Sequence, residues 1–524
     1  MIRIFEIKCA TDQQSEIEAQ LLKKLNISKK DLFSWSVHRK SIDARGQKIS
    51  FSFVVDATVA NEKKALKKKG VQPTPDETYY PAKPGQKPLT TRPVVVGFGP
   101  AGMFASLILA QAGYQPIVIE RGSELKKRSQ DVDAFWKTGQ LNPEDNVQFG
   151  MGGAGAFSDG KLTTRSKDAR ARKVLEELVS FGANPEILID QHPHIGSDAF
   201  LPIIENLRKE IERLGGSFYF DARLDDVNCK ENQLSSLTWN QESHEAQAAI
   251  LAIGHSAGDT IRMLHQRGVQ IENKPFAVGV RIEHTQHFIN QAMLKQASQD
   301  PRFIPARYQV THTASNEKGV YSFCMCPGGY VIAASSHPGR LVINGMSYAA
   351  RDNVNANSAL LVQVNESDYG SQLFAGLDYQ EQLEEKAYQA SGSFQACAQL
   401  AVDYLENRVS THFEDVQPTY SLGITFVDLN TFFSDSVNQA LHEGLLAFEK
   451  KVPGFLDGAI LTGVESRSSS AVRICRDQHF MSNIQGLFPC GEGSGYAGGI
   501  MTSAIDGIKA AEKLIETYKL PEVQ

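Results

Sequence analysis

The clearest pattern of apolar and polar positions lies between Pro93 and Glu120, in the segment PVVVGFGPAGMFASLILAQAGYQPIVIE. Val94 to Val96 form a continuous apolar run, which is typical of a parallel strand buried on both faces. A helical stretch and a second apolar run follow, and the segment ends in an acidic residue. Three glycines at G-x-G-x-x-G spacing follow the first run, namely Gly97, Gly99 and Gly102. The pattern predicts a strand, a glycine turn, a helix and a second strand.

Each position of this segment has a physical role in binding a dinucleotide. Gly97 permits the tight turn, Gly99 lets the backbone approach a pyrophosphate, and Gly102 lets the helix pack against the strand. The helix that begins near Pro100 directs its free N–H groups at the pyrophosphate. Glu120 can accept hydrogen bonds from a ribose. We therefore predict a nucleotide site here, which also includes the neighbouring residues Ala101 and Arg121.

The same stretch has a rival interpretation as a membrane span. From Pro93 to Ile119 it contains no charged residue, so a hydropathy window would flag it. The glycines, two prolines and two glutamines interrupt it, and a strand–helix–strand unit explains the periodicity better. We interpret it as a buried core and expect no membrane association.

A second glycine-rich segment, FGMGGAGAFSDGKL, runs from Phe149 to Leu162 and contains five glycines. Such a loop brings backbone N–H groups close to an anionic or planar ligand. An ordinary flexible loop is the alternative, but the flanking apolar residues favour a packed one. The residues assigned to the cofactor from this segment are Gly152, Gly153, Gly155 and Ala156.

The alternation of strands and helices continues beyond this loop. We expect a helix over 198–214 with Ser197 as its N-cap, followed by a strand over 217–222. An apolar strand within Ala248–Thr260 then runs into Gly254, the layout of a strand-end glycine that closes over a cofactor. This rhythm predicts a doubly wound sheet.

The last nucleotide-binding segment lies near the C-terminus. A short strand over 486–490 leads to Gly491 and Glu492, and the pair Gly498-Gly499 opens a long helix from Ile500 to Tyr518. The carboxylate can hydrogen-bond a ribityl hydroxyl, and the helix N-terminus can stabilise negative charge on a reduced flavin ring. Because an FAD site is assembled from segments far apart in sequence, these segments together predict noncovalent FAD rather than NAD.

Composition excludes several classes of protein. The chain has 524 residues and a net charge of -6, so we expect two to four domains. Glu6 and Lys8 interrupt the N-terminal segment before an apolar signal region develops. Seven cysteines, an odd number and mostly far apart, favour reduced thiols in the cytoplasm. No Cys/His cluster has zinc-ligand spacing, so no metal site is expected.

The charge is unevenly distributed along the chain. Residues 1–70 hold 15 Lys and Arg against 8 Asp and Glu, or about +7, which leaves about -13 for the remainder. We interpret them as a separate basic α+β module, with strands over 3–9, 32–39 and 49–58 and a helix over 14–25. Its lysine run, residues 63–69, leaves a nucleic-acid role open. We favour the alternative interpretation, in which these lysines form a solvated face at the start of a charged linker.

The domain boundaries follow from these features. The N-terminal module covers 1–70, and the proline-rich stretch 71–92 is an extended linker. The FAD-binding domain covers 93–264 and 466–524. Residues 265–465 form an inserted substrate domain with helices expected over 380–389 and 394–406. No second G-x-G-x-x-G occurs within the insertion, so NADH or NADPH, if it is the electron donor, would dock transiently.

The motifs resemble a bacterial family of FAD-dependent proteins, also called "NAD(FAD)-utilizing dehydrogenases". Besides the glycine fingerprint, the motifs that carry the resemblance are SIDAR (41–45), GHSA (254–257), KPFAVGVRIEH (274–284), FCMCPGGYVIAA (323–334), INGMSYAARDNVNANSALLV (343–362), GVESRSSSAVRICRD (463–477) and GEGSGYAGGIMTSAIDG (491–507). The resemblance covers nearly the whole chain. It implies a flavoprotein of the glutathione-reductase superfamily, with a Rossmann-type FAD-binding domain and an inserted α+β substrate domain. Many FAD enzymes have Asp where Glu492 stands, and the longer side chain should still reach a ribityl hydroxyl.

Four residues are candidates for the chemistry. Cys324 and Cys326 are two positions apart on a predicted strand, so both thiols would face the same way. They would either relay electrons from a flavin or serve as small buried side chains. Glu465 and Arg467 form an expected acid–base pair in a loop just before the last FAD segment, which would either face the flavin or serve as a structural ion pair. His255 would cap a turn or move protons, and Arg281, Glu283 and His284 are expected on a solvated strand face.

These features predict an FAD-dependent oxidoreductase, a dehydrogenase or reductase linked to NAD(P)H or to a substrate. The expected partner is a small-molecule substrate or electron acceptor. Two alternatives stay open: an RNA-directed flavoprotein that uses the basic module, and a non-catalytic flavin redox sensor.

Overall fold

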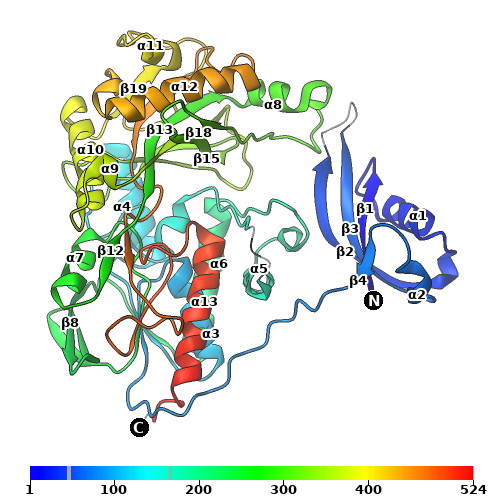
Figure 1. Ribbon diagram of the computed structural model, residues 1–524, viewed down its shortest axis with the longest axis horizontal. Coiled ribbons are helices and arrows are strands. Elements are labelled where there is room, and N and C mark those ends of the chain that lie inside the picture. Colours follow the sequence, from blue (N-terminus) through cyan, green and yellow to red (C-terminus); the bar gives the residue numbers. More distant parts are fainter. Residues whose placement is uncertain (44–48, 165, 167, 523–524) are drawn as a thin grey trace.

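The computed structural model describes residues 1–43, 49–164, 166 and 168–522. It contains a nucleotide-binding domain, a second domain inserted into it, and a small N-terminal module that lies to one side (Figure 1). In the SIDAR motif, Ala44 and Arg45 lie outside the described residues.

The nucleotide-binding domain is built on a parallel sheet in the order β23-β11-β5-β6-β7. The strands are β5 (Val94–Val96), β6 (Ile117–Ile119), β7 (Ser217–Tyr219), β11 (Ala249–Leu251) and β23 (Leu487–Pro489). Helix α3 (Pro100–Gln111) packs against α13 (Ile500–Thr517), so both ends of the domain's sequence meet beside one sheet (Figure 1). This confirms the Rossmann-type fold class.

Further elements surround this sheet. They are the helices α4 (Leu125–Thr138), α5 (Ala169–Ser180), α6 (Ser197–Arg213) and α7 (Gly258–Gln266), and an antiparallel sheet of β8 (Leu224–Lys230), β9 (Gln233–Trp239) and β10 (Glu242–Glu245). The first turn of α6 differs from the prediction by one position. Its N-cap is Gly196, and Ser197 is already helical without a side-chain cap.

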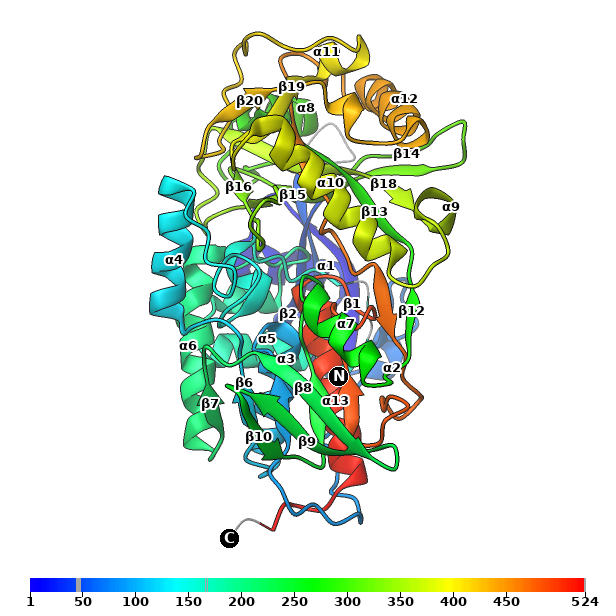
Figure 2. The same cartoon turned by 90° about the vertical axis from the view of Figure 1, so that its left-hand side faces the viewer.

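The inserted domain has a seven-stranded sheet in the order β14-β15-β18-β13-β21-β19-β20. Its strands are β13 (Phe276–Thr285), β14 (Thr311–Thr313), β15 (Gly319–Cys326), β18 (Asn355–Val364), β19 (Ala396–Leu400), β20 (Ile424–Phe426) and β21 (Ile460–Glu465). A hairpin of β16 (Tyr330–Ala333) and β17 (Ile343–Met346) adjoins it. Its helices are α8 (Gln286–Leu294), α9 (Glu366–Tyr369), α10 (Ala375–Ser391), α11 (Ala401–Leu405) and α12 (Asp435–Lys451). The short strands β12 (Ile271–Asn273) and β22 (Val472–Ile474) pair where the chain passes between the two domains (Figure 2).

Two expectations for the inserted domain are wrong. Residues 394–406, expected as a helix, form strand β19 followed by the short helix α11, because pairing in the central sheet overrides local propensity. Arg281, Glu283 and His284 do not lie on a solvated face. All three are buried, since β13 is a central strand flanked by β18 and β21.

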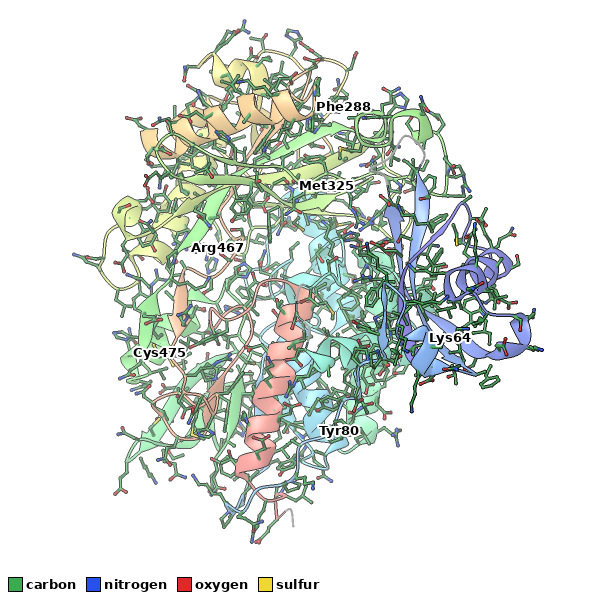
Figure 3. All side chains as sticks on the ribbon, turned by 45° about the vertical axis from the view of Figure 1, so that its right-hand side comes forward. Lys64, Tyr80, Phe288, Met325, Arg467 and Cys475 are labelled. Atoms are coloured by element: carbon green, nitrogen blue, oxygen red, sulfur yellow. The ribbon has the colours of Figure 1, made fainter. Side chains whose placement is uncertain are left out.

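The N-terminal module is a sheet in the order β2-β3-β1-β4 with two helices. Its elements are β1 (Ile2–Cys9), α1 (Gln14–Leu25), β2 (Leu32–Asp43), β3 (Ser50–Val59), α2 (Glu62–Ala65) and β4 (Val71–Pro73). The backbone of Lys40 on β2 exchanges hydrogen bonds with Ile189 (2.6 Å) and Gln191 (2.9 Å) of the nucleotide-binding domain. The Phe51 and Phe303 rings, 5.3 Å apart, join the module to the inserted domain. Lys64, in the lysine run, lies on the side of the module away from both domains (Figure 3).

The linker beyond β4 follows the surface to the C-terminal helix (Figure 1). The Gly85 N–H donates to the carbonyl of Ile515 (2.8 Å), and a Cβ atom at Gly85 would lie 2.2 Å from the carbonyl oxygen of Glu516. A larger residue would therefore separate the linker from α13. Among the helices of the described residues, none is long and apolar enough to cross a bilayer.

Candidate functional site

A cavity with a solvent-accessible volume of about 240 Å³ lies where the nucleotide-binding domain meets the inserted domain. All the glycine-rich segments singled out in the sequence contribute to its wall. The predicted cofactor residues that line it are Gly97, Gly99, Pro100, Ala101, Glu120, Arg121, Gly153, Gly155, Gly254, Gly491, Glu492, Gly499 and Ile500.

Four predicted cofactor residues are not part of this wall: Gly102, Gly152, Ala156 and Gly498. Gly102 has a packing role, because a Cβ atom there would lie 1.8 Å from the carbonyl oxygen of Gly97. Gly152 has a positive φ of 94°, and its Cβ atom would meet the Ile204 side chain at 2.7 Å. Both glycines thus permit the close packing of the segments behind the cavity wall.

Glu120 connects two of the glycine segments. Its carboxylate accepts hydrogen bonds from the backbone N–H groups of Phe98 (2.7 Å), Gly122 (3.2 Å) and Gly150 (3.0 Å). The fingerprint turn and the 149–162 loop are thereby fixed against each other. The adjacent Arg121 stacks on the Phe149 ring at 4.0 Å and pairs with Glu144 and Asp259.

Two helix N-termini open onto the cavity. Helix α3 begins after Gly99 and α13 after Gly499, and neither N-cap has a side chain that could satisfy the free N–H groups. Such ends attract an anionic group. A Cβ atom on Gly499 or Gly254 would meet nothing within 4 Å, and both residues have positive φ. The backbone at these points is therefore bare toward the cavity.

Glu492 and His255 lie together on this wall. The Nδ1 atom of His255 is 3.4 Å from Glu492 Oε1, and Glu492 Oε2 accepts a hydrogen bond from the Gly499 N–H (3.1 Å). Burial lowers the pKa of His255, so the imidazole is favoured in its neutral form. The His255–Glu492 pair thus fixes the turn that precedes α13.

Arg467 supplies an unused donor. Glu384 accepts its Nε–H at 2.6 Å and its Nη2–H at 3.0 Å, while Nη1 is buried without a hydrogen-bond partner among the described residues. Arg467 lines the cavity at the junction of the two domains (Figure 3). A buried charged donor without a partner is costly. A ligand oxygen or nitrogen in the cavity would satisfy it.

The expected pairing of Glu465 with Arg467 is wrong. Glu465 accepts a 2.6 Å hydrogen bond from Arg281, and Arg467 belongs to Glu384 instead. The reason is strand geometry, because Glu465 ends β21 directly beside β13, which carries Arg281. Burial raises the pKa of Glu465 to about 7, and the nearby Cys324 adds to this effect.

Arg281 organises the floor of the cavity although it is fully buried. Besides Glu465, it donates to the side-chain oxygens of Asn357 (2.8 Å) and Asn344 (3.1 Å) and to the carbonyl of Cys324 (2.8 Å). The sequence contains a signal for this burial, since the five residues directly before Arg281, Phe276 to Val280, include no polar side chain.

Cys324 and Cys326 do not face the same way as a regular strand would require. A β-bulge lies between Phe323 and Cys326, and Cys324 has a positive φ of 43°. As a result, Cys324 is partly exposed and lines the cavity, whereas Cys326 is completely buried behind it.

Lys161 is the site residue that the sequence analysis missed. Its Nζ atom lies 3.8 Å from the Cys324 sulfur and 3.6 Å from Asp159, and it also donates to the carbonyl of Met325. The charged residues Asp159 and Lys161 at the end of the glycine-rich loop were the available signal. Gln148, Phe323, Asn344 and Ser503 also line the cavity without having been singled out.

The site's donor set fits FAD. Bare glycine backbone and two free helix N-termini suit a pyrophosphate, and the unpartnered Arg467 nitrogen suits an electron-rich ring atom or oxygen. Within the described residues no cluster of three or more His, Cys, Asp or Glu side chains could hold a metal ion.

Comparisons with known proteins agree with this description. Residues 275–468 match a family model described as "FAD-dependent protein, C-terminal domain-like", and residues 1–58 match a domain of unknown function. An uncharacterized protein of Clostridium beijerinckii is 45% identical over 531 residues, which cover 99% of this chain and all of that protein.

Similarity to solved structures is much weaker. The glycerol-3-phosphate dehydrogenase from Bacillus halodurans, complexed with FAD, is 11% identical, with 82% of this chain and 64% of that chain covered and a TM-score of 0.34. The chain thus spans just under two thirds of that enzyme's length. The L-proline dehydrogenase from P. horikoshii is 12% identical, with 83% and 96% coverage and a TM-score of 0.34. These values are too low to support an activity.

Proposed function

Since the chain belongs to the same family as the uncharacterized C. beijerinckii protein and matches the FAD-dependent protein model over residues 275–468, we propose that it is an FAD-dependent oxidoreductase acting on a small-molecule substrate or acceptor. The supporting observation is one cavity lined both by the glycine segments of the nucleotide-binding domain and by polar side chains of the inserted domain. FAD would supply two-electron chemistry there.

The residues of the chain have distinct tasks in this proposal. The N-terminus of α3, with Gly99, would hold the pyrophosphate, and the carboxylate of Glu120 would fix the loops around the adenosine half. The N-terminus of α13, with Glu492 behind it, would face the ribityl chain and ring. Arg467 would donate through its unpartnered Nη1 and stabilise negative charge on the reduced cofactor.

The inserted domain would supply the substrate side. Phe323, Cys324, Asn344 and Glu465 reach the cavity from it, and together they combine an apolar surface with polar groups. NADH or NADPH is the proposed transient electron donor, because the inserted domain contains no G-x-G-x-x-G segment that would hold it permanently. The two other functions considered, RNA modification and redox sensing, gain no support from any contact among the described residues.

The proposal is tested on the purified full-length protein. We expect a yellow protein with a flavin absorption band that bleaches in anaerobic stopped-flow mixing with NADH or NADPH and returns with a suitable acceptor. A colourless protein that takes up no FAD on titration would contradict it. Bleaching by neither nucleotide would instead point to a substrate as the electron source.

A further inference from the structure

The bulge on β15 places two cysteines in a relationship that a regular strand cannot provide. Two positions along a strand correspond to roughly 6.6 Å, whereas a disulfide requires Cβ atoms about 3.5–4.5 Å apart. The bulge between Phe323 and Cys326 and the positive φ of Cys324 break this regular spacing. The Cys326 thiol lies against residue 324, with its sulfur 3.2 Å from the Cys324 carbonyl oxygen, and the two thiols interact.

The two thiols have unequal access to the cavity. Cys324 is partly exposed and belongs to the cavity wall, while Cys326 is fully buried. One sulfur can therefore meet an incoming molecule, and the other can meet only its neighbour.

A positively charged side chain lies beside each sulfur, and each of these cations is itself paired with a carboxylate, Lys161 with Asp159 and Arg281 with Glu465. Lys161 Nζ is 3.8 Å from the Cys324 sulfur, and Arg281 Nη2 is 3.8 Å from the Cys326 sulfur. The hydrogen bond from Cys326, with the charges of Lys161 and Arg281, holds the pKa of the Cys324 thiol well below its usual range. The same contact raises the pKa of Cys326. Such an electropositive, partly exposed setting is that of a reactive cysteine rather than a structural one.

We propose that Cys324 and Cys326 form a redox-active dithiol that reduces disulfide substrates in the cavity, with Cys324 as the attacking thiolate and Cys326 as the resolving thiol. The Cys324 thiolate attacks one substrate sulfur. A mixed disulfide forms, and the other substrate sulfur leaves as a thiolate that takes a proton from solvent.

Cys326 then completes the exchange. It gives up its proton and attacks the Cys324 sulfur, which forms the Cys324–Cys326 disulfide and releases the second substrate thiol. The protein dithiol has been oxidised by two electrons, and the substrate disulfide has been reduced to two thiols. Return to the dithiol needs two electrons and two protons. This return step rests on the proposed function, because dihydroflavin would be the reductant.

The first test measures thiol reactivity in the FAD-loaded full chain. Iodoacetamide alkylation, followed by peptide mass mapping, should modify Cys324 at pH 7 much faster than the half-exposed Cys475, which lies outside the cavity and serves as internal control (Figure 3). Lys161→Met should slow alkylation of Cys324 about tenfold, the effect of one pKa unit. Equal rates at Cys324 and Cys475 would overturn the proposal.

The second test traps the intermediate with a chromogenic aromatic disulfide as the probe. Wild-type protein should release two aromatic thiols and lose the mass of two hydrogen atoms within the peptide that contains Cys324 and Cys326. Cys326→Ser should release one aromatic thiol and keep the other half of the probe on Cys324. Cys324→Ser should do neither, and Cys475→Ser should behave as wild type.

The outcomes separate this proposal from the proposed function. A Cys326→Ser variant that keeps the flavin band and its bleaching but forms no mixed disulfide with the probe overturns the dithiol assignment alone. A full-length protein that takes up no FAD on titration but still exchanges thiols with the probe overturns the proposed function alone.

Discussion

The guanidinium of Arg281 donates a 2.6 Å hydrogen bond to the carboxylate of Glu465, although 184 residues separate them in the sequence. Adjacent strands β13 and β21 bring them together, and both side chains are almost completely buried below the cavity. Removing one partner of a buried pair leaves an uncompensated charge at a cost of about 3–5 kcal/mol. The pair is therefore central to both stability and the electrostatics of the site.

A pH-dependent effect should follow from Glu465. Its pKa is about 7 in the folded protein against an ordinary value of 4.5, so the folded state holds this proton more tightly than the unfolded state. The resulting stability is fully present below about pH 4.5 and is lost as the pH rises through 7. A glutamine at this position does not titrate. The free energy of unfolding of Glu465→Gln, relative to that of the wild type, should therefore be higher at pH 8 than at pH 5. Urea unfolding at both pH values measures this, and an unchanged difference would contradict it.

Alanine substitutions at two fingerprint glycines should affect cofactor binding and folding separately. A Cβ atom on Gly99 would make only an ordinary contact with Gly153 at 3.6 Å, so Gly99→Ala should change apoprotein stability by less than about 1 kcal/mol. It should weaken FAD binding at least about tenfold, because the added methyl group displaces the pyrophosphate.

Gly102→Ala is the matched comparison. Its Cβ atom would lie 1.8 Å from the Gly97 carbonyl oxygen, so the fold itself should lose at least about 2 kcal/mol. Thermal unfolding of the apoproteins and FAD titration distinguish the two variants. Similar apoprotein stabilities would show that α3 does not pack as described.

A single and a double variant separate two roles of Arg467, its pairing with the buried Glu384 and its proposed contact with FAD. Arg467→Met leaves Glu384 buried and unpaired and should destabilise the protein by about 3–5 kcal/mol. The double variant Arg467→Met, Glu384→Leu removes both charges and should recover much of that loss. Both variants should still bind FAD about tenfold or more weakly, since a charged hydrogen bond contributes about 1.5–3 kcal/mol. Normal FAD affinity in the double variant would exclude the contact.

The N-terminal module should detach when its aromatic contact is removed. Phe303 is buried against Phe51, so Phe303→Asp should free the module and expose the linker to chymotrypsin at the Tyr79–Tyr80 bond. Phe33 on β2 is 66% exposed, and Phe33→Asp serves as the control that should leave cleavage unchanged. Equal cleavage of both variants would mean that the backbone pairing at Lys40 suffices to hold the module.

Much of the nucleotide-binding domain was predictable because its signals are local. The apolar run at 94–96 and the glycine spacing define a strand, a turn and a helix within one short segment, and α3 and α1 begin where the pattern predicted. The helix at 500–517 was equally clear, because a glycine pair precedes a long amphipathic stretch. Short-range backbone geometry and helix periodicity determine such elements, and both depend only on residues that are close together in the sequence.

Only the tertiary structure decided which charges and thiols meet. Glu465 and Arg467 are neighbours in sequence, but strand pairing gives Glu465 to Arg281 and leaves Arg467 to Glu384 on α10. A bulge turns Cys324 toward the cavity and Cys326 away from it, and Lys161 arrives from a different domain. Partners of this kind depend on sheet order and register, which arise from long-range packing. The sequence by itself thus determined the cofactor-binding framework, and the fold alone determined the chemistry that faces it.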